Sequence, residues 1–138
     1  MRPLIYALIS AVFAALVAIF GKIGLKDVDS TLATTIRSLV MASFLCIVAI
    51  SLGKGTLLHT IDSKAITYII LSGVAGALSW LFYFFAIKNG QVAGVAAIDR
   101  TSIVFVFILA VLFLGESFTW MKVFGAVCIV AGAILMVL

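Results

Sequence analysis

Charged residues are scarce in this sequence. They make up 10% of its 138 residues, whereas 66% are hydrophobic. Soluble domains carry about a quarter charged residues and roughly half apolar ones. A water-soluble core cannot account for this excess, so the composition excludes an ordinary soluble domain and indicates that the lipid bilayer is the solvent.

The residue types that most enzymes and metal sites require are also few. The single histidine, His59, has no partner, and no spacing resembles a zinc site, a phosphate-binding loop or a nucleophile triad. Cys46 and Cys128 fall near the middles of apolar stretches, where core packing is preferred over a disulfide. We therefore expect no catalytic residue, no metal and no cofactor, and a protein that is not an enzyme.

Basic residues are too dispersed to form a nucleic-acid surface. The net charge is +4, but the nine lysines and arginines are spread along the whole chain and make no basic patch. This modest excess suits anionic lipid headgroups instead. Membrane lipids are therefore expected partners and nucleic acid is not.

Long apolar runs fill nearly the whole chain. A membrane-spanning helix needs about 20 mostly apolar residues. Five stretches qualify, and they predict an all-α polytopic membrane protein with one five-helix domain over residues 1–138. The first run is longer than the apolar region of a secretory signal, so we expect it to be an uncleaved span. The predicted helices are residues 3–25, 31–52, 65–87, 92–114 and 120–138.

The links between these stretches are short, so consecutive helices must run antiparallel. The ends of the first and third helices and the starts of the second and fourth then share one membrane face, which we call the first-loop face. Orientation should follow the lysine and arginine content of the loops, but the two faces carry four and three such residues and hardly differ. The N-terminal face has Arg2, Lys54, Lys64 and Lys122, and the first-loop face has Lys22, Lys26 and Lys88.

Four ionisable side chains enter the predicted membrane region from the first-loop face: Lys22, Arg37, Asp99 and Arg100. Arg37 lies about 9 Å into its helix at 1.5 Å per residue, and Asp99 and Arg100 lie slightly deeper. A charge at the centre of a span costs at least about 2.5 to 3.5 kcal/mol and is usually paired or next to a water-filled cavity.

The sequence therefore predicts that Asp99 pairs with Arg37 or Arg100 and leaves one cation spare. Such a pair can fix helix packing, or it can handle a substrate or a proton. Lys22 lies near the end of its helix, where it can also extend to the headgroups. Thr34 and Ser102 each lie three residues from a charged side chain, so both helices offer a hydroxyl to line a polar site.

An aromatic stripe follows the third predicted helix. Trp80, Tyr83, Phe84 and Ile87 have the i, i+3, i+4, i+7 spacing of one helix face. Packing or lipid contact is the commoner meaning of such a stripe. The functional alternative is the wall of a substrate cavity, for which Trp80 and Tyr83 have polar groups.

Small residues mark a candidate helix contact in the fifth predicted helix. Gly125 and Gly132 are seven residues apart, which places them about two turns apart on one face. We take this face as the preferred oligomer contact.

Several motifs carry a family resemblance. Residues 114–119 (LGESFT), followed by Gly125 and residues 130–135 (VAGAIL), are similar to the end of an EamA domain of the drug/metabolite transporter superfamily, and residues 20–25 (FGKIGL) with Arg37 resemble its start. Residues 95–102 (VAAIDRTS) resemble a five-span bacterial and archaeal subgroup in which an acidic-basic pair opens the fourth helix and a proline often stands at the position of Ala97. The resemblance implies secondary transport of small metabolites, usually outward.

We therefore expect an exporter of a small organic solute in the cell (inner) membrane, with Arg37, Asp99 and Arg100 at its site. A spare cation favours an anionic or zwitterionic small-molecule substrate such as an amino acid. The alternative is a non-transporting membrane subunit, or one that helps lipid-linked intermediates to flip. Because many transporters use two inverted repeats, we also expect a homodimer or a pair with a close relative, in which the two chains are antiparallel.

Overall fold

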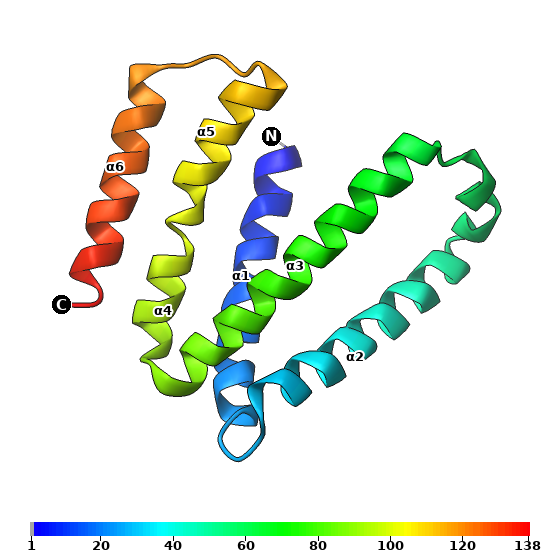
Figure 1. Cartoon of the computed structure of the whole chain (residues 1–138), viewed down its shortest axis with the longest axis horizontal. Helices are drawn as coiled ribbons and strands as arrows, with labels where there is room; N and C mark the ends of the chain where they lie inside the picture. Colours follow the sequence, from blue (N-terminus) through cyan, green and yellow to red (C-terminus); the bar gives the residue numbers. More distant parts are fainter. Residues whose placement is uncertain (1) are drawn as a thin grey trace. The chain divides into compact units, whose positions relative to one another are not determined.

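The computed structural model describes residues 2–138, apart from the side chain of Leu58. All regular structure in this range is helical (Figure 1). The predicted all-α fold class is thereby confirmed. The helices are α1 (Arg2–Gly24), α2 (Ser30–Ser51), the 3₁₀ helix η1 (Lys54–Thr60), α3 (Ser63–Asn89), α4 (Val92–Asp99), α5 (Ser102–Leu114) and α6 (Trp120–Leu135).

Four segments are long and apolar enough to cross a membrane: α1, α2, α3 and the 23-residue segment Val92–Leu114, which contains α4 and α5. The fourth predicted helix is thus two helices. The fifth, α6, has 16 residues, about 24 Å at 1.5 Å per residue, against about 30 Å of bilayer hydrocarbon. The fold is therefore four apolar spans with a shorter fifth helix.

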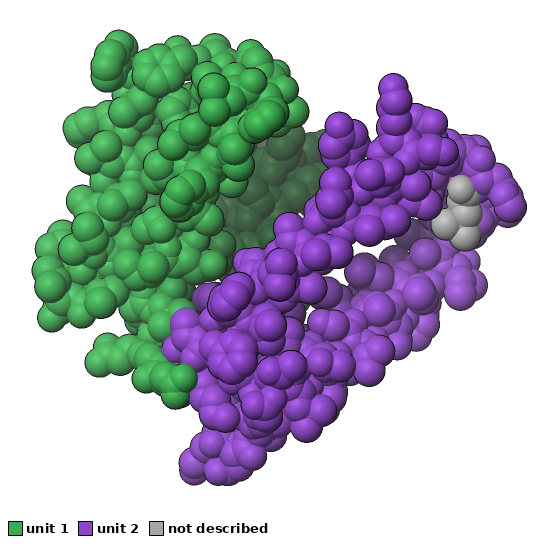
Figure 2. All heavy atoms as spheres, in the orientation of Figure 1, with its two compact units in different colours: residues 1–22, 89–138 green, residues 23–88 purple. Residues whose placement is uncertain are grey.

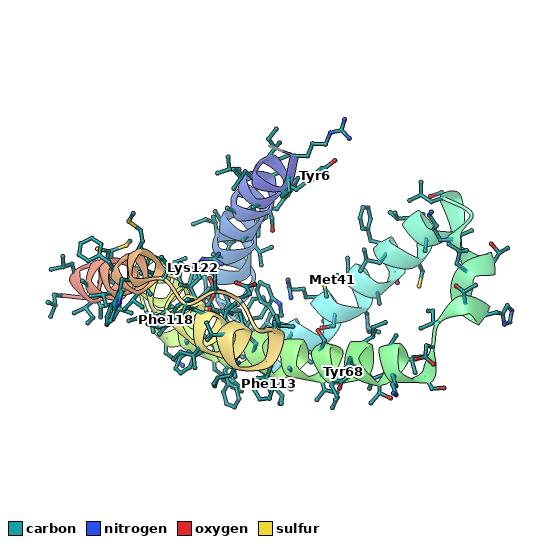
Figure 3. The ribbon with its side chains drawn as sticks, turned by 90° about the horizontal axis from the view of Figure 1, so that it is seen from above. Tyr6, Met41, Tyr68, Phe113, Phe118 and Lys122 are labelled. Carbon is teal, nitrogen blue, oxygen red and sulfur yellow. The ribbon has the colours of Figure 1, made fainter. Side chains whose placement is uncertain are left out.

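The apolar side chains point outward along these helices. Tyr68 and Phe113 are 72% and 80% exposed and extend away from their ribbons (Figure 3). Cys46 and Cys128 are free and exposed as well, so the expectation that they pack in the core is wrong. Exposed apolar residues at this density require lipid or another apolar protein surface around them.

The chain divides into two compact units (Figure 2). The first comprises residues 1–22 and 89–138 and holds α1, α4, α5 and α6. The second comprises residues 23–88 and holds α2, η1 and α3. The assignment of residues 1–138 to one domain stays a prediction.

Within the first unit, the C-terminal end of α6 packs against α4 (Figure 1). A Cβ atom added to Gly94 on α4 would lie 3.3 Å from Cγ2 of Val137. The buried face of α6 carries Ala126 and Ala133, which are 9% and 4% exposed. Small residues therefore bring these helices together, as is common in membranes.

The glycines predicted for oligomer contact lie elsewhere on α6. A Cβ atom added to Gly125 or Gly132 would meet nothing within 4 Å, and both residues are exposed. No contact within the chain uses these two glycines in the range that the structure describes. Their role in an oligomer stays a prediction.

Within the second unit, polar contacts in the α1–α2 link fix the start of α2. Asp29 is its N-cap and accepts hydrogen bonds from the backbone amides of Thr31 at 2.9 Å and Leu32 at 3.1 Å. The Leu32 bond, ahead of the others, holds the pKa of Asp29 below its usual value of 3.8. The ionised Asp29 carboxylate therefore stabilises the folded protein slightly at a pH above 3.8. This effect is lost as the pH falls through the lower pKa of Asp29 in the folded state.

The end of α3 is tied to the same link. Lys88 Nζ donates to the carbonyl oxygen of Val28 at 2.9 Å. This bond holds the last turn of α3 beside the first turn of α2, and so it sets which residues of the two helices can meet.

The packing at Gly94 gives a first prediction. Gly94→Leu should lower the stability of the detergent-solubilised protein by about 1 to 3 kcal/mol, because the larger side chain overpacks against Val137. Gly73→Leu is the control, since a Cβ atom there meets nothing within 4 Å. Thermal unfolding measures both variants. Equal stability of the two would contradict the packing of α4 on the end of α6.

Candidate functional site

A polar stripe runs along the first turns of α2. Ser30, Thr34 and Arg37 have i, i+4, i+7 spacing, which places them on one helix face. Ser30 and Thr34 are 1% and 7% exposed, and Arg37 is half-buried. Hydroxyl groups at this depth need partners, and Thr34 Oγ1 donates to the carbonyl oxygen of Ser30 at 2.7 Å.

The aromatic stripe predicted on α3 is the least exposed face of that helix near its C-terminal end. Phe84 and Ile87 are 3% and 0% exposed, and Trp80 and Tyr83 are half-buried. The Trp80 ring meets those of Tyr83 and Phe84 edge to face, with centroids 5.4 and 5.9 Å away. Such contacts fix the orientation of the indole. That the stripe walls a cavity stays a prediction.

Arg37 joins the two stripes. Its Cζ atom lies 3.7 Å from the centroid of the Trp80 ring and 5.6 Å from that of Phe84. A guanidinium stacked on an indole gains a cation–π attraction of about 1 kcal/mol, and more where water is excluded. The aromatic stripe therefore holds the Arg37 guanidinium within the second unit.

Two polar atoms on the α2 stripe have no partner. Over the described residues, Ser30 Oγ and Arg37 Nη1 are shielded from solvent and make no hydrogen bond. An unmade hydrogen bond of a buried group costs about 1 to 3 kcal/mol, and more for a charged one. Since stacking leaves the donors in the guanidinium plane available, Arg37 can still bind a carboxylate through two parallel N–H groups.

The other predicted charges lie in the first unit. Asp99 ends α4 and is half-buried, and Arg100 follows it and is exposed. No ion pair joins Asp99 to Arg100 within residues 2–138. Consecutive helical residues point about 100° apart, which explains why these two do not meet. Asp99 and Arg37 belong to different units, so the pair between them stays a prediction.

Ser102 and Lys22 are the remaining predicted polar site residues. Ser102 is exposed and begins α5. Lys22 Nζ donates to the carbonyl oxygen of Gly90 at 2.9 Å, which ties the end of α1 to the link before α4. The lysine therefore has a structural contact, and its part in a substrate site stays a prediction.

Ser30 is the residue that the sequence analysis did not select. Its spacing of four from Thr34 and seven from Arg37 places it on the same helix face and could have identified it. The exposed ion pair between Lys122 and Glu116, at 3.6 Å, lies at the α5–α6 link. At such an exposed position it contributes little to stability.

The fold and these intramembrane charges define a multi-pass α-helical membrane protein. No group of three or more potential metal-ligating side chains occurs in the part of the chain that the structure describes. The chain belongs to the EamA-like transporter family, which matches residues 1–138, and it is therefore a membrane transporter in class.

Two relatives align over almost their full lengths. The chain is 41% identical over 131 residues to an uncharacterized transporter in the cobO 3′ region of Sinorhizobium sp., covering 95% of this chain and 93% of the relative. It is 27% identical over 133 residues to the uncharacterized protein MJ1333.1 of Methanocaldococcus jannaschii, covering 96% and 94%. No solved structure matches it.

The Arg37–Trp80 stack gives a second prediction. In a double-mutant cycle with Arg37→Met and Trp80→Leu, the coupling free energy should be about 1 kcal/mol, because each single variant removes the same cation–π contact. Tyr68→Leu paired with Arg37→Met is the control, since Tyr68 on the same helix α3 is 72% exposed. Thermal unfolding of the purified variants measures the cycle. A coupling energy near zero would show that the stack does not hold Arg37.

Proposed function

We propose that this chain is a secondary transporter that exports a small organic anion or zwitterion, such as an amino acid, across the cell membrane. Arg37 is the group that recognises the carboxylate. The observation that carries this proposal is a guanidinium held on Trp80 at 3.7 Å while its Nη1 has no partner among the described residues. A buried cation with an unused donor is suited to an anionic ligand.

The hydroxyl next to Arg37 favours a zwitterion over a simple anion. Thr34 Oγ1 gives its proton to the carbonyl oxygen of Ser30, so toward a ligand it can act only as an acceptor. An acceptor one turn away from a carboxylate-binding guanidinium suits an ammonium group. Amino acids carry both groups on one carbon atom.

We propose Asp99, Arg100 and Ser102 as a further set of functional residues, and this set lies within the first unit. Asp99 forms no ion pair with any described residue, so its carboxylate is available to a ligand. Trp80 and Tyr83 supply an apolar wall with polar edges for the rest of the solute. Lys22 fixes the backbone before α4 through its bond to Gly90, within the same unit as Asp99.

Flux measurements test the role of Arg37. In proteoliposomes, Arg37→Gln should lower the counterflow of radiolabelled amino acids at least tenfold, because the carboxylate loses a charged partner. Arg37→Lys should be intermediate, since it keeps the charge but loses the planar pair of donors. Lys54→Gln, an exposed substitution at the start of η1, is the control and should retain wild-type flux.

Thermal stability is read in the same series, together with Asp99→Asn. Lower stability with full flux would show that the charges only fix helix packing. Unchanged flux and stability in both Arg37→Gln and Asp99→Asn would reject the site. Absence of any flux by the wild-type protein, over a broad panel of organic anions and amino acids, would favour the alternative of a non-transporting membrane subunit.

We further propose that the transporter is a homodimer, or a pair with a close relative, in which the two chains are antiparallel. Each candidate span buries only 6% of its window within the chain, which leaves wide apolar surfaces for a second copy. The exposed Gly125 and Gly132 on α6 permit close helix approach. Many transporters are built from two repeats with opposite orientations in the membrane. Two copies of this chain, inserted in opposite orientations, would supply these two repeats.

Cysteine labelling tests this arrangement. Thr56→Cys and Arg2→Cys are introduced singly into a variant in which Cys46 and Cys128 are replaced. Because the loop charges are nearly balanced, each new cysteine should be labelled in part from either side of the membrane. Labelling of each site from one side only would exclude dual topology and would leave a parallel dimer or a monomer.

A further inference from the structure

The fourth span is interrupted without a proline or glycine. The α-helical pattern stops at Asp99 and resumes at Ser102. The break lies eight residues into the 23-residue segment Val92–Leu114, about 12 Å along it, and so inside the hydrocarbon region. The amide of Arg100 is shared between Ala96 O at 3.3 Å and Ala97 O at 3.1 Å. Bonds between residues three apart then take over: Thr101 N to Ile98 O at 2.9 Å, Ile103 N to Arg100 O at 3.2 Å and Val104 N to Thr101 O at 3.0 Å.

This change of pattern leaves backbone groups unmatched. Over residues 2–138, neither the carbonyl oxygen of Asp99 nor the amide of Ser102 makes a backbone hydrogen bond. The Thr101 hydroxyl does not fill the gap, because it donates to the carbonyl oxygen of Ile98 at 2.7 Å. Irregular backbone at membrane depth is tolerated only where it is buried in protein or lines a water-filled cavity.

The same turn carries a carboxylate. Asp99 forms no ion pair with any described residue, so its carboxylate lacks a partner. Its backbone carbonyl oxygen lacks one as well, because it makes no backbone hydrogen bond. The hydroxyl of Ser102 adds a third oxygen within one turn. The C-terminal end of α4, whose dipole is negative, ends at this point. The carboxylate, the carbonyl oxygen and the hydroxyl oxygen can each coordinate a cation, whereas the Ser102 amide at the start of α5 cannot.

We propose that this turn binds the coupling cation of transport and that the cation is Na⁺. The ligands are the Asp99 carboxylate, the Asp99 carbonyl oxygen and the Ser102 hydroxyl. A proton would neutralise the carboxylate alone, whereas a small hard cation also satisfies the carbonyl oxygen. Unwound backbone at the ends of half-helices is where transporters bind such ions. The coupling role rests on the transport function proposed above, but the binding itself does not.

Direct binding of ²²Na⁺ to the purified wild-type protein tests the proposal. Saturable binding with about one ion per chain is expected, with competition by unlabelled Na⁺ but not by choline. Asp99→Asn should weaken binding at least tenfold, because it removes the charge. Ser102→Ala should weaken it severalfold, because it removes one neutral ligand. Asp27→Asn, an exposed carboxylate in the α1–α2 link, is the control and should bind as the wild type does.

Several results would overturn the proposal. Absence of saturable ²²Na⁺ binding would mean that only water satisfies the turn, and equal binding by Asp99→Asn would place the ion elsewhere. A thermal stability that responds to pH but not to Na⁺ would assign the carboxylate to a proton. If Asp99→Asn does not fold, the ²²Na⁺ binding isotherms of the wild type and of Ser102→Ala still show whether the turn binds the ion.

Arg37→Gln separates this inference from the proposed function. It removes the carboxylate-binding group but should bind ²²Na⁺ as the wild type does. Sodium binding in a protein whose flux does not depend on Arg37 would reject the proposed substrate site and leave the cation site in place. Flux that depends on Arg37, in a protein that does not bind sodium, would support the proposed substrate site and reject the cation site.

Discussion

Backbone hydrogen bonding inside a bilayer is the constraint on which the rest of this structure depends. With no water to receive them, backbone N–H and C=O groups must find partners within their own segment, so the chain folds into helices before it folds into anything else. Apolar side chains then need no interior. The spans can therefore leave residues such as Phe113 exposed, and the few polar groups in the spans carry the information about function.

Among residues 2–138, two sets of polar groups without a hydrogen-bond partner carry the proposals, one set in each unit. In the second unit they are Arg37 Nη1 and Ser30 Oγ, and in the first they are the backbone groups at the α4–α5 break. Each costs free energy of about 1 to 3 kcal/mol unless something satisfies it. The anion site and the cation site proposed above are both assigned where this cost arises.

The sequence predicted the helices well because length and apolarity decide them. It also predicted the aromatic stripe, since Trp80 and Phe84 follow a helical period, but of the polar stripe on α2 it selected only Thr34 and Arg37. It did not predict the 3.7 Å stack of Arg37 on Trp80, because that contact depends on the register between α2 and α3, which Asp29 and Lys88 set through backbone bonds in the link. The α4–α5 break was equally hidden, since residues 97–101 contain no proline or glycine to signal it.

The two proposed sites together give a physical reason for coupled transport. A charge at the centre of a span costs at least about 2.5 to 3.5 kcal/mol. With only the solute bound, Asp99 remains charged and unpaired, and with only Na⁺ bound, Arg37 does. The solute and the cation each neutralise one fixed charge, so either ligand lowers the cost of reorienting the carrier below that of the empty state. Arg100 does not disturb this balance, because it is exposed and its long side chain can extend toward water.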